Sequence, residues 1–138
     1  MSPQQPGFDL DASLVAEIAR DEQIDEATLI ARIDAGTVVA MGGNGVRPMA
    51  IGEGLRTKIN ANLGTSPDYP EPDSELKKLH AAVASGADAV MDLSTGGDID
   101  DIRRAIRSEC PVALGTVPIY QAFAEADATS GNMMSMTA

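Results

Sequence analysis

The 138-residue sequence predicts an α/β protein with parallel strands. Two observations predict this class. From residue 57 onward, short apolar runs of strand length alternate with longer segments whose apolar residues recur at helical spacing. Glycine or proline stands where these segments meet, as expected at the ends of helices and strands. Such alternation joins parallel strands by right-handed crossovers, which fits both a doubly wound sheet and a (β/α)₈ barrel.

The composition limits the classes of function. Apolar residues make up 43% of the chain, which predicts a folded domain. A net charge of −11 repels phosphate backbones and anionic lipid, so we expect neither a nucleic-acid nor a membrane partner. The single cysteine, Cys110, forms no internal disulfide and holds no iron–sulfur cluster alone. Without a long apolar segment or a basic-then-apolar leader, we expect a cytoplasmic protein.

Residues 1–56 predict a small helical region with one short strand. Apolar residues recur at helical spacing over residues 12–20 and again over about 26–35. Gly36 follows, where a helix end favours a left-handed residue. Residues 37–41 then predict a strand. The glycine-rich stretch after it is typical of a turn, because no helix with a Lys-Ser/Thr pair follows, as a phosphate-binding loop requires.

Three further strands are predicted at residues 58–63, 89–93 and 112–117. The first alternates between apolar and polar residues. Its apolar side chains share one face: Ile59, Ala61 and Leu63. The second is nearly all apolar, as expected for a strand covered on both faces, and Pro118 stops the third.

Two helices are predicted between these strands. In the first, Asp73 or Ser74 supplies the amino-terminal cap and Gly86 follows the last turn. Its buried stripe is Leu76, Leu79 and Val83. In the second, Asp98 supplies the cap and Pro111 closes the segment. Its inward residues are Ile99, Ile102 and Ile106.

Three long and unusual stretches carry a family resemblance. They are residues 58–62 (KINAN), 90–96 (VMDLSTG) and 115–122 (GTVPIYQA). With them, the chain resembles the phosphomethylpyrimidine synthase family, strongly over residues 51–122 and more loosely over 12–50.

The resemblance implies an enzyme of thiamin biosynthesis, a radical S-adenosylmethionine carbon–carbon lyase. The family converts aminoimidazole ribotide into hydroxymethylpyrimidine phosphate. A [4Fe–4S] cluster cleaves S-adenosylmethionine, and the resulting radical abstracts hydrogen from this small-molecule substrate. The family fold is a (β/α)₈ TIM barrel, and members of the family form homodimers. By this resemblance, residues 57–122 form the first three strand–helix units of an incomplete barrel, and residues 123–138 form a truncated tail.

Substrate contacts of the family carry over to Asn62, Met91 and Tyr120. Each is 29 residues from the next, close to the roughly 30 residues of one barrel unit, so we expect them at equivalent places near strand ends. An amide, a thioether and a phenol suit the binding of a polar heterocycle, and none is a catalytic acid or base. Lys58 is expected to be solvated or to cap, rather than to bind phosphate.

The sequence allows two roles for each of two other polar residues. Asp92 and Ser94 either line the site or cap the helix that follows them. No metal-binding or catalytic residue is predicted in the chain. The family's zinc-binding histidines and its C-x₂-C-x₄-C cluster motif are absent, so we expect the isolated chain to be inactive.

The departures from the family pattern leave several possibilities. The chain is expected to be an amino-terminal portion: a truncated product, a gene fragment, or a subunit that pairs with a complementary carboxyl-terminal chain. No completed helix is expected from residue 125 onward. Residues 41–47 differ from the family's usual Pro-Ala-Asn-rich loop, which leaves 5-hydroxybenzimidazole synthase as an alternative. A non-catalytic barrel fragment that binds a partner chain or a nucleotide is the third possibility.

Overall fold

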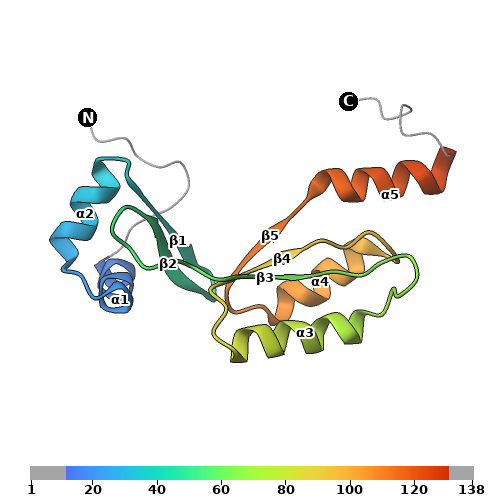
Figure 1. Cartoon of the computed structure of the whole chain (residues 1–138), viewed down its shortest axis with the longest axis horizontal. Coiled ribbons are helices and arrows are strands. Elements are labelled where there is room, and N and C mark those ends of the chain that lie inside the picture. The colour runs from blue at the N-terminus through green and yellow to red at the C-terminus, as the bar shows by residue number, and fades with distance from the viewer. Residues whose placement is uncertain (1–11, 131–138) are drawn as a thin grey trace. The chain divides into compact units, whose positions relative to one another are not determined.

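The computed structural model describes residues 12–130 and confirms the α/β class (Figure 1). Its contacts divide the chain into two units. The first ends at Lys58 and includes Pro111–Ala113, and the second comprises Ile59–Cys110 and the residues from Leu114 onward. Each unit is therefore described separately.

The first unit has two helices and a β-hairpin. They are α1 (Ala12–Glu22), α2 (Glu26–Asp34), β1 (Val38–Gly43) and β2 (Val46–Gly52). Both predicted helices and the first strand are confirmed. Strand β2 is not predicted, because Arg47 and Pro48 interrupt its apolar pattern. The predicted turn lies between the two strands, where Asn44 and Gly45 have φ of 54° and 83°, values typical of a type I′ hairpin turn.

Apolar side chains from both helices and from one face of the hairpin form the core of the first unit. They are Val15, Ile18, Ala19, Leu29, Ile33, Val38, Ala40 and Ala50. On the other face of the hairpin, Val39 and Ile51 are cross-strand partners and each is 46% exposed. Alternation along the two strands therefore separates a buried face from an exposed one.

The second unit alternates strands and helices. Its elements are β3 (Asn60–Leu63), α3 (Pro72–Ala84), β4 (Ala89–Asp92), α4 (Ile99–Glu109), β5 (Ala113–Thr116) and α5 (Pro118–Ser130). The strands form one sheet in the order β3-β4-β5, and β3 pairs with β4 in parallel. The predicted parallel pairing is thus confirmed for β3 and β4.

Helices α3 and α4 lie along one side of β3 and β4 (Figure 1). Residues of both layers are buried: Leu63, Leu79, Val90, Ile99, Ile102 and Ile106. The three isoleucines of α4 are inward as predicted, and Asp98 caps this helix by accepting a hydrogen bond from Asp101 N at 3.0 Å. Within residues 12–130, no helix combines the length and apolar character needed to cross a membrane.

Two expectations for the start of this unit are wrong. Helix α3 begins at Pro72 after Glu71, without a side-chain cap, so neither Asp73 nor Ser74 caps it. Proline suits the first helical position because its φ is already helical. The helix therefore begins at Pro72, earlier in the sequence than predicted. Ile59 lies before β3 and is 63% exposed, so it does not share the buried face of Leu63.

The expectation of no helix after residue 125 is also wrong. Pro118 ends the strand as predicted, but it begins α5, which continues to Ser130. A proline at the first helical position and the alanines that follow it favour this helix. Residues 131–138, the rest of the expected tail, lie outside the described residues.

Candidate functional site

Asn62 and Met91 are neighbours across the parallel strands β3 and β4, where they are paired in register. Paired residues of adjacent strands point to the same face of a sheet. Asn62 is exposed and Met91 is partly exposed, whereas the next residues, Leu63 and Asp92, are buried. Asn62 and Met91 therefore lie on the face opposite the one that buries Leu63 and Asp92.

A second asparagine orients Asn62. Asn60 lies two residues earlier on the same face of β3, and its Nδ2 donates a hydrogen bond to Asn62 Oδ1 at 3.0 Å. The amide oxygen of Asn62 is therefore turned toward Asn60. Sequence reasoning singles out Asn62 alone, although the spacing of two asparagines in KINAN already places both on one face.

Strand β5 extends this face through Gly115. A Cβ atom built on Gly115 would lie 2.9 Å from both the Sδ and the Cε atoms of Met91. The thioether of Met91 thus lies over Gly115, in space that only a glycine leaves open. Asn62, Met91 and Gly115 form a continuous strip across the three strands, which we call the open face.

Tyr120 is placed on another element. It lies in the first turn of α5, where its backbone N donates to Val117 O at 3.0 Å, and it is 42% exposed. Its neighbours Ile119 and Phe123 are 58% and 40% exposed. The structure therefore brings Asn62 and Met91 together, and it puts Tyr120 beyond the end of β5 rather than in the strip.

The loops that follow β3 and β4 are bonded to each other. Thr65 N donates to Ser94 Oγ at 3.2 Å, and Thr65 Oγ1 donates to Gly96 O at 2.6 Å. In return, Thr95 N donates to Thr65 O at 2.8 Å. These bonds hold the two loops at the carboxyl ends of the strands in one fixed arrangement.

Asp92 is 1% exposed and carries part of this arrangement. Its Oδ1 accepts hydrogen bonds from Ser94 Oγ at 2.5 Å and Ser94 N at 3.0 Å, and its Oδ2 lies 3.4 Å from Arg103 Nε. Neither Asp92 nor Ser94 therefore caps α4, so the capping interpretation is wrong. Asp92 points to the buried face because it follows Met91 by one residue, and Asp98 is the cap of α4.

The structure also corrects the expectation for Lys58. Its side chain is 7% exposed, with Nζ 2.6 Å from Glu22 Oε1 and donating to Arg56 O at 2.9 Å. Lys58 is neither solvated nor a helix cap. The lysine of KINAN is a buried partner of a carboxylate on α1, and nothing in its own motif reveals that partner.

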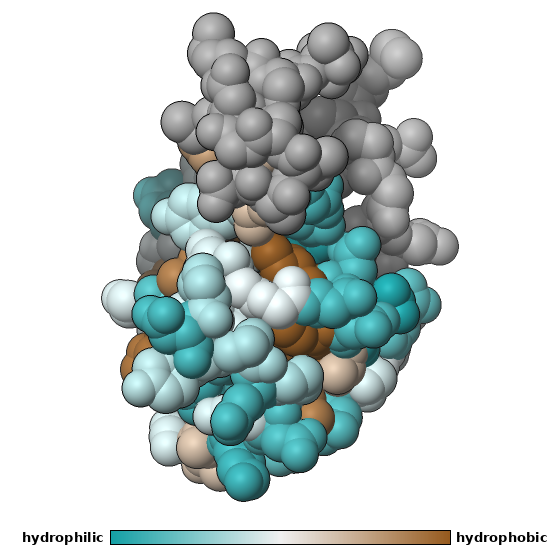
Figure 2. Space-filling model, turned by 90° about the vertical axis from the view of Figure 1, so that its right-hand side faces the viewer, coloured by the Kyte–Doolittle hydropathy of each residue, from teal (hydrophilic) through white to brown (hydrophobic). Residues whose placement is uncertain are grey.

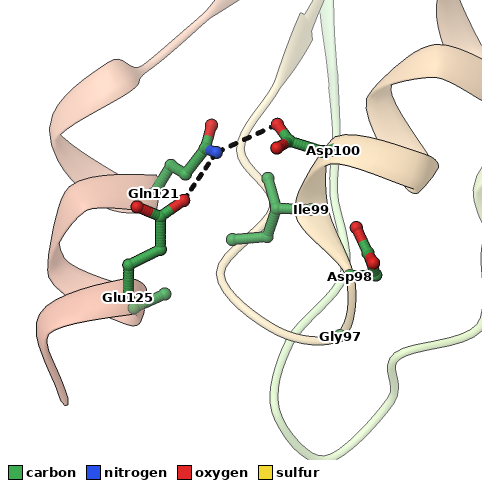
Figure 3. Close-up of a pocket in the computed structure, with 7 residues that line it drawn as sticks. Gly97, Asp98, Ile99, Asp100, Gln121 and Glu125 are labelled. Atoms are coloured by element: carbon green, nitrogen blue, oxygen red, sulfur yellow. Dashed lines mark hydrogen bonds between the residues drawn. The ribbon is translucent and has the colours of Figure 1, made fainter. Parts of the chain in front are cut away.

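Two hollows in the second unit are lined by residues that the structure describes. One, of about 220 Å³, is drawn in Figure 3 and is lined by Gly97, Asp98, Ile99, Asp100, Gln121, Ala124 and Glu125. The other, of about 350 Å³, is lined by Gly64, Ser66, Tyr69, Glu71, Ser74, Glu75 and Lys78. On the face that Figure 2 presents, hydrophilic residues predominate and an apolar area lies among them. Neither hollow includes the open face or Tyr120.

The residues of this chain do not fit a metal cluster. Cys110, the single cysteine of the sequence, is buried, and the single histidine, His80, has Nε2 2.8 Å from Glu109 Oε2. Among the described residues, no three His, Cys, Asp or Glu side chains are grouped so that they could hold a metal ion. The residues that the structure describes therefore form no such ligand group for an iron–sulfur cluster or a zinc ion.

Comparison with known proteins gives a consistent result. A model of the Radical SAM ThiC family matches residues 10–138. A phosphomethylpyrimidine synthase of Moorella thermoacetica is 49% identical over 124 residues, covering 88% of this chain and 29% of that protein. Those of Desulfitobacterium hafniense and Methanopyrus kandleri are 55% and 51% identical, over 67% and 80% of this chain and 22% and 27% of their own lengths. The chain therefore spans less than a third of the length of each of these three relatives.

Proposed function

Because this chain belongs to the Radical SAM ThiC family, we propose that it forms the first part of the substrate site of a thiamin pyrimidine synthase. The whole enzyme would be a carbon–carbon lyase that converts aminoimidazole ribotide into hydroxymethylpyrimidine phosphate. The observation that carries the proposal is the open face, where the register of β3 and β4 puts Asn62 beside Met91. The relatives from Moorella, Desulfitobacterium and Methanopyrus are all phosphomethylpyrimidine synthases, which favours this product over a benzimidazole.

The proposed fold of the whole protein is a TIM barrel, of which β3, β4 and β5 with their helices are the first three units. The parallel pairing of β3 with β4, and the position of α3 and α4 on one side of them, support this proposal. In such a barrel the helices form the outer ring, so the open face would look into the lumen. Active sites of these barrels lie at the carboxyl ends of the strands, which is where Asn62 and Met91 lie in β3 and β4.

Each residue has a proposed role in binding. The Asn62 amide offers a donor and an acceptor to an amine or a ring nitrogen, and the Met91 thioether gives apolar contact to a flat heterocycle. The Tyr120 ring and hydroxyl hold a polar group of the substrate. None of the three transfers a proton. Their contribution is to bind and orient the substrate, while a cofactor carries the difficult chemical step.

The cofactors of the proposed enzyme are S-adenosylmethionine, a [4Fe–4S] cluster and zinc. With one cysteine and one histidine in the sequence, their ligands would come from residues outside these 138, in the same chain or in a complementary chain. We therefore expect the 138-residue chain to bind substrate and not to turn it over. Anaerobic reconstitution that yields an active, cluster-bearing 138-residue protein would contradict this.

Binding is tested by titrating aminoimidazole ribotide into the 138-residue chain labelled with ¹³C in its methionine methyl groups and tyrosine rings. We expect the Met91 methyl and Tyr120 ring signals to shift, and those of Met41 and Tyr69 to stay in place. Asn62→Ala and Tyr120→Phe should weaken binding by about tenfold each, a loss typical of one hydrogen bond, whereas Tyr69→Phe should not. Absence of shifts at Met91 and Tyr120 at saturating ligand would refute the proposed site.

A further inference from the structure

A chain of side-chain contacts crosses the second unit behind the open face. Its centre is Arg103 on α4, whose side chain is 26% exposed. Arg103 Nε lies 3.4 Å from Asp92 Oδ2 on β4, and Arg103 Nη1 donates to Gln121 Oε1 on α5 at 2.6 Å. One guanidinium therefore joins a strand and two helices.

Gln121 uses its whole amide group in this chain of contacts. Its oxygen accepts from Arg103, and its Nε2 donates to Asp100 Oδ1 at 3.0 Å and to Glu125 Oε1 at 2.8 Å (Figure 3). Asp100 belongs to the first turn of α4 and Glu125 to α5 itself. The first turn of α5 is thus held on the amino-terminal half of α4 by hydrogen bonds with fixed donors and acceptors.

Two residues of this chain of contacts, Asp92 and Gln121, are next in sequence to the residues that we propose to touch substrate. Asp92 follows Met91 directly, and Gln121 follows Tyr120 directly. Asp92 and Gln121 are also 29 residues apart, as Met91 and Tyr120 are. Because successive residues of a strand point to opposite faces, fixing Asp92 on the buried face fixes Met91 on the open face.

We infer that Arg103 is a positioning residue, which holds Met91 through Asp92 and Tyr120 through Gln121. This inference rests on the proposed function for the identity of the substrate. A guanidinium suits the task because its donors point in fixed, different directions, so it reaches a carboxylate and an amide at once. A lysine ammonium at the same position has no such planar fork.

The sequence offers a matched control on the same helix. Arg104 is 74% exposed, and it pairs with Asp101 one turn earlier on α4. Arg103→Met and Arg104→Met remove the same charge from adjacent positions, so the difference between them isolates the contacts of Arg103. Gln121→Glu is the second informative variant. It keeps an acceptor for Arg103 and replaces the donor with a carboxylate that repels Asp100 and Glu125.

The first measurement needs no ligand. In the labelled 138-residue chain we expect Arg103→Met to shift and broaden the signals of both the Met91 methyl and the Tyr120 ring, and Arg104→Met to leave both unchanged. Gln121→Glu should move the Tyr120 signal and leave Met91 in place, a split that general destabilisation would not produce. In Arg103→Lys, the lysine can still pair with Asp92. We therefore expect the Met91 signal of this variant to lie closer to its position in the unmodified chain than the Tyr120 signal does.

The second measurement is the affinity for aminoimidazole ribotide, which Arg103→Met should weaken by about tenfold or more relative to Arg104→Met. If Arg103→Met leaves both signals and the affinity unchanged, the positioning role is refuted. If Arg103→Met fails to fold, Gln121→Glu and Arg103→Lys decide, and a Tyr120 signal unmoved in both refutes the role. If the unmodified chain does not bind the ribotide, the proposed function fails, while the ligand-free signals still decide whether Arg103 positions Met91 and Tyr120.

Discussion

Lys58 Nζ lies 2.6 Å from Glu22 Oε1, and both side chains are buried, with 7% and 0% exposed. Glu22 Oε2 also accepts a hydrogen bond from Arg56 N at 2.9 Å. Glu22 stands at the end of α1 and Lys58 just before β3. The pair therefore ties the segment that leads into KINAN to the helical part of the first unit.

Replacing Lys58 should be costly, because a buried carboxylate loses its partner. We expect Lys58→Met to lower the free energy of unfolding by about 3 kcal/mol, measured by urea unfolding followed by circular dichroism. The exposed Lys77→Met is the control and should change it by less than about 0.5 kcal/mol. The double variant Glu22→Gln, Lys58→Met should recover much of the loss. Equal stability of Lys58→Met and Lys77→Met would contradict the importance of the pair.

Two glycines of the site should differ in their response to alanine. A Cβ atom on Gly96 would lie 2.3 Å from the backbone C atom of Ser66, whereas one on Gly115 would meet only the flexible end of Met91, apart from a normal contact with Val90 O at 3.9 Å. Gly96→Ala should therefore destabilise the protein by about 1–3 kcal/mol. Gly115→Ala should cost less and should displace the Met91 methyl signal. Thermal unfolding and methyl NMR measure the two effects, and a reversed order of stability would contradict them.

Ser94 serves as donor and acceptor at a buried position. Ser94→Ala removes the bond to Asp92 and leaves Thr65 N without this acceptor. We expect a loss of about 1–3 kcal/mol in the free energy of unfolding, because buried polar groups lose their partners. Ser108→Ala is the matched control, since Ser108 is exposed and bonds only a carbonyl of its own helix. A smaller loss for Ser94→Ala than for Ser108→Ala would contradict the prediction.

The cap of α2 makes stability depend on pH. Hydrogen bonds from the Thr28 side chain, at 2.7 Å, and from Thr28 N, at 2.8 Å, hold the pKa of Asp25 below its ordinary value of 3.8. A lowered pKa stabilises the fold above the pKa of the unfolded chain, and this contribution is lost as the pH falls through the folded pKa. Thr28→Val should therefore raise the pKa of Asp25 and reduce stability at neutral pH. The difference should shrink in acid. Carboxyl ¹³C titration and unfolding at both pH values measure it, and an unchanged pKa would contradict it.

Local patterns predict the elements that depend on local interactions. Helix α4 is an example, since its cap Asp98 and its buried isoleucines are all within one segment. Strand β2 shows the limit, because its pairing with β1 overrides the weak strand pattern around Pro48. The start of α3 was displaced by Pro72, whose preference for the first helical position outweighs two good capping residues.

The same difference between local and long-range interactions applies to the candidate site. The 29-residue spacing predicts that Asn62 and Met91 occupy equivalent positions, and the strands pair them directly. Contacts between segments distant in the chain are different, because no local pattern encodes them. Neither the pairing of Lys58 with Glu22 nor the link from Arg103 to Gln121 follows from a motif. Both contacts exist only because the fold brings distant segments together.

Gly115 determines where the side chain of Met91 can lie on the sheet. Because it contributes no side chain, the Sδ and Cε atoms of Met91 on β4 reach over β5, to 2.9 Å from where a Cβ atom of residue 115 would stand. The reach of the Met91 side chain across the sheet therefore depends on a residue of the neighbouring strand. Any larger residue at position 115 would displace the end of the Met91 side chain.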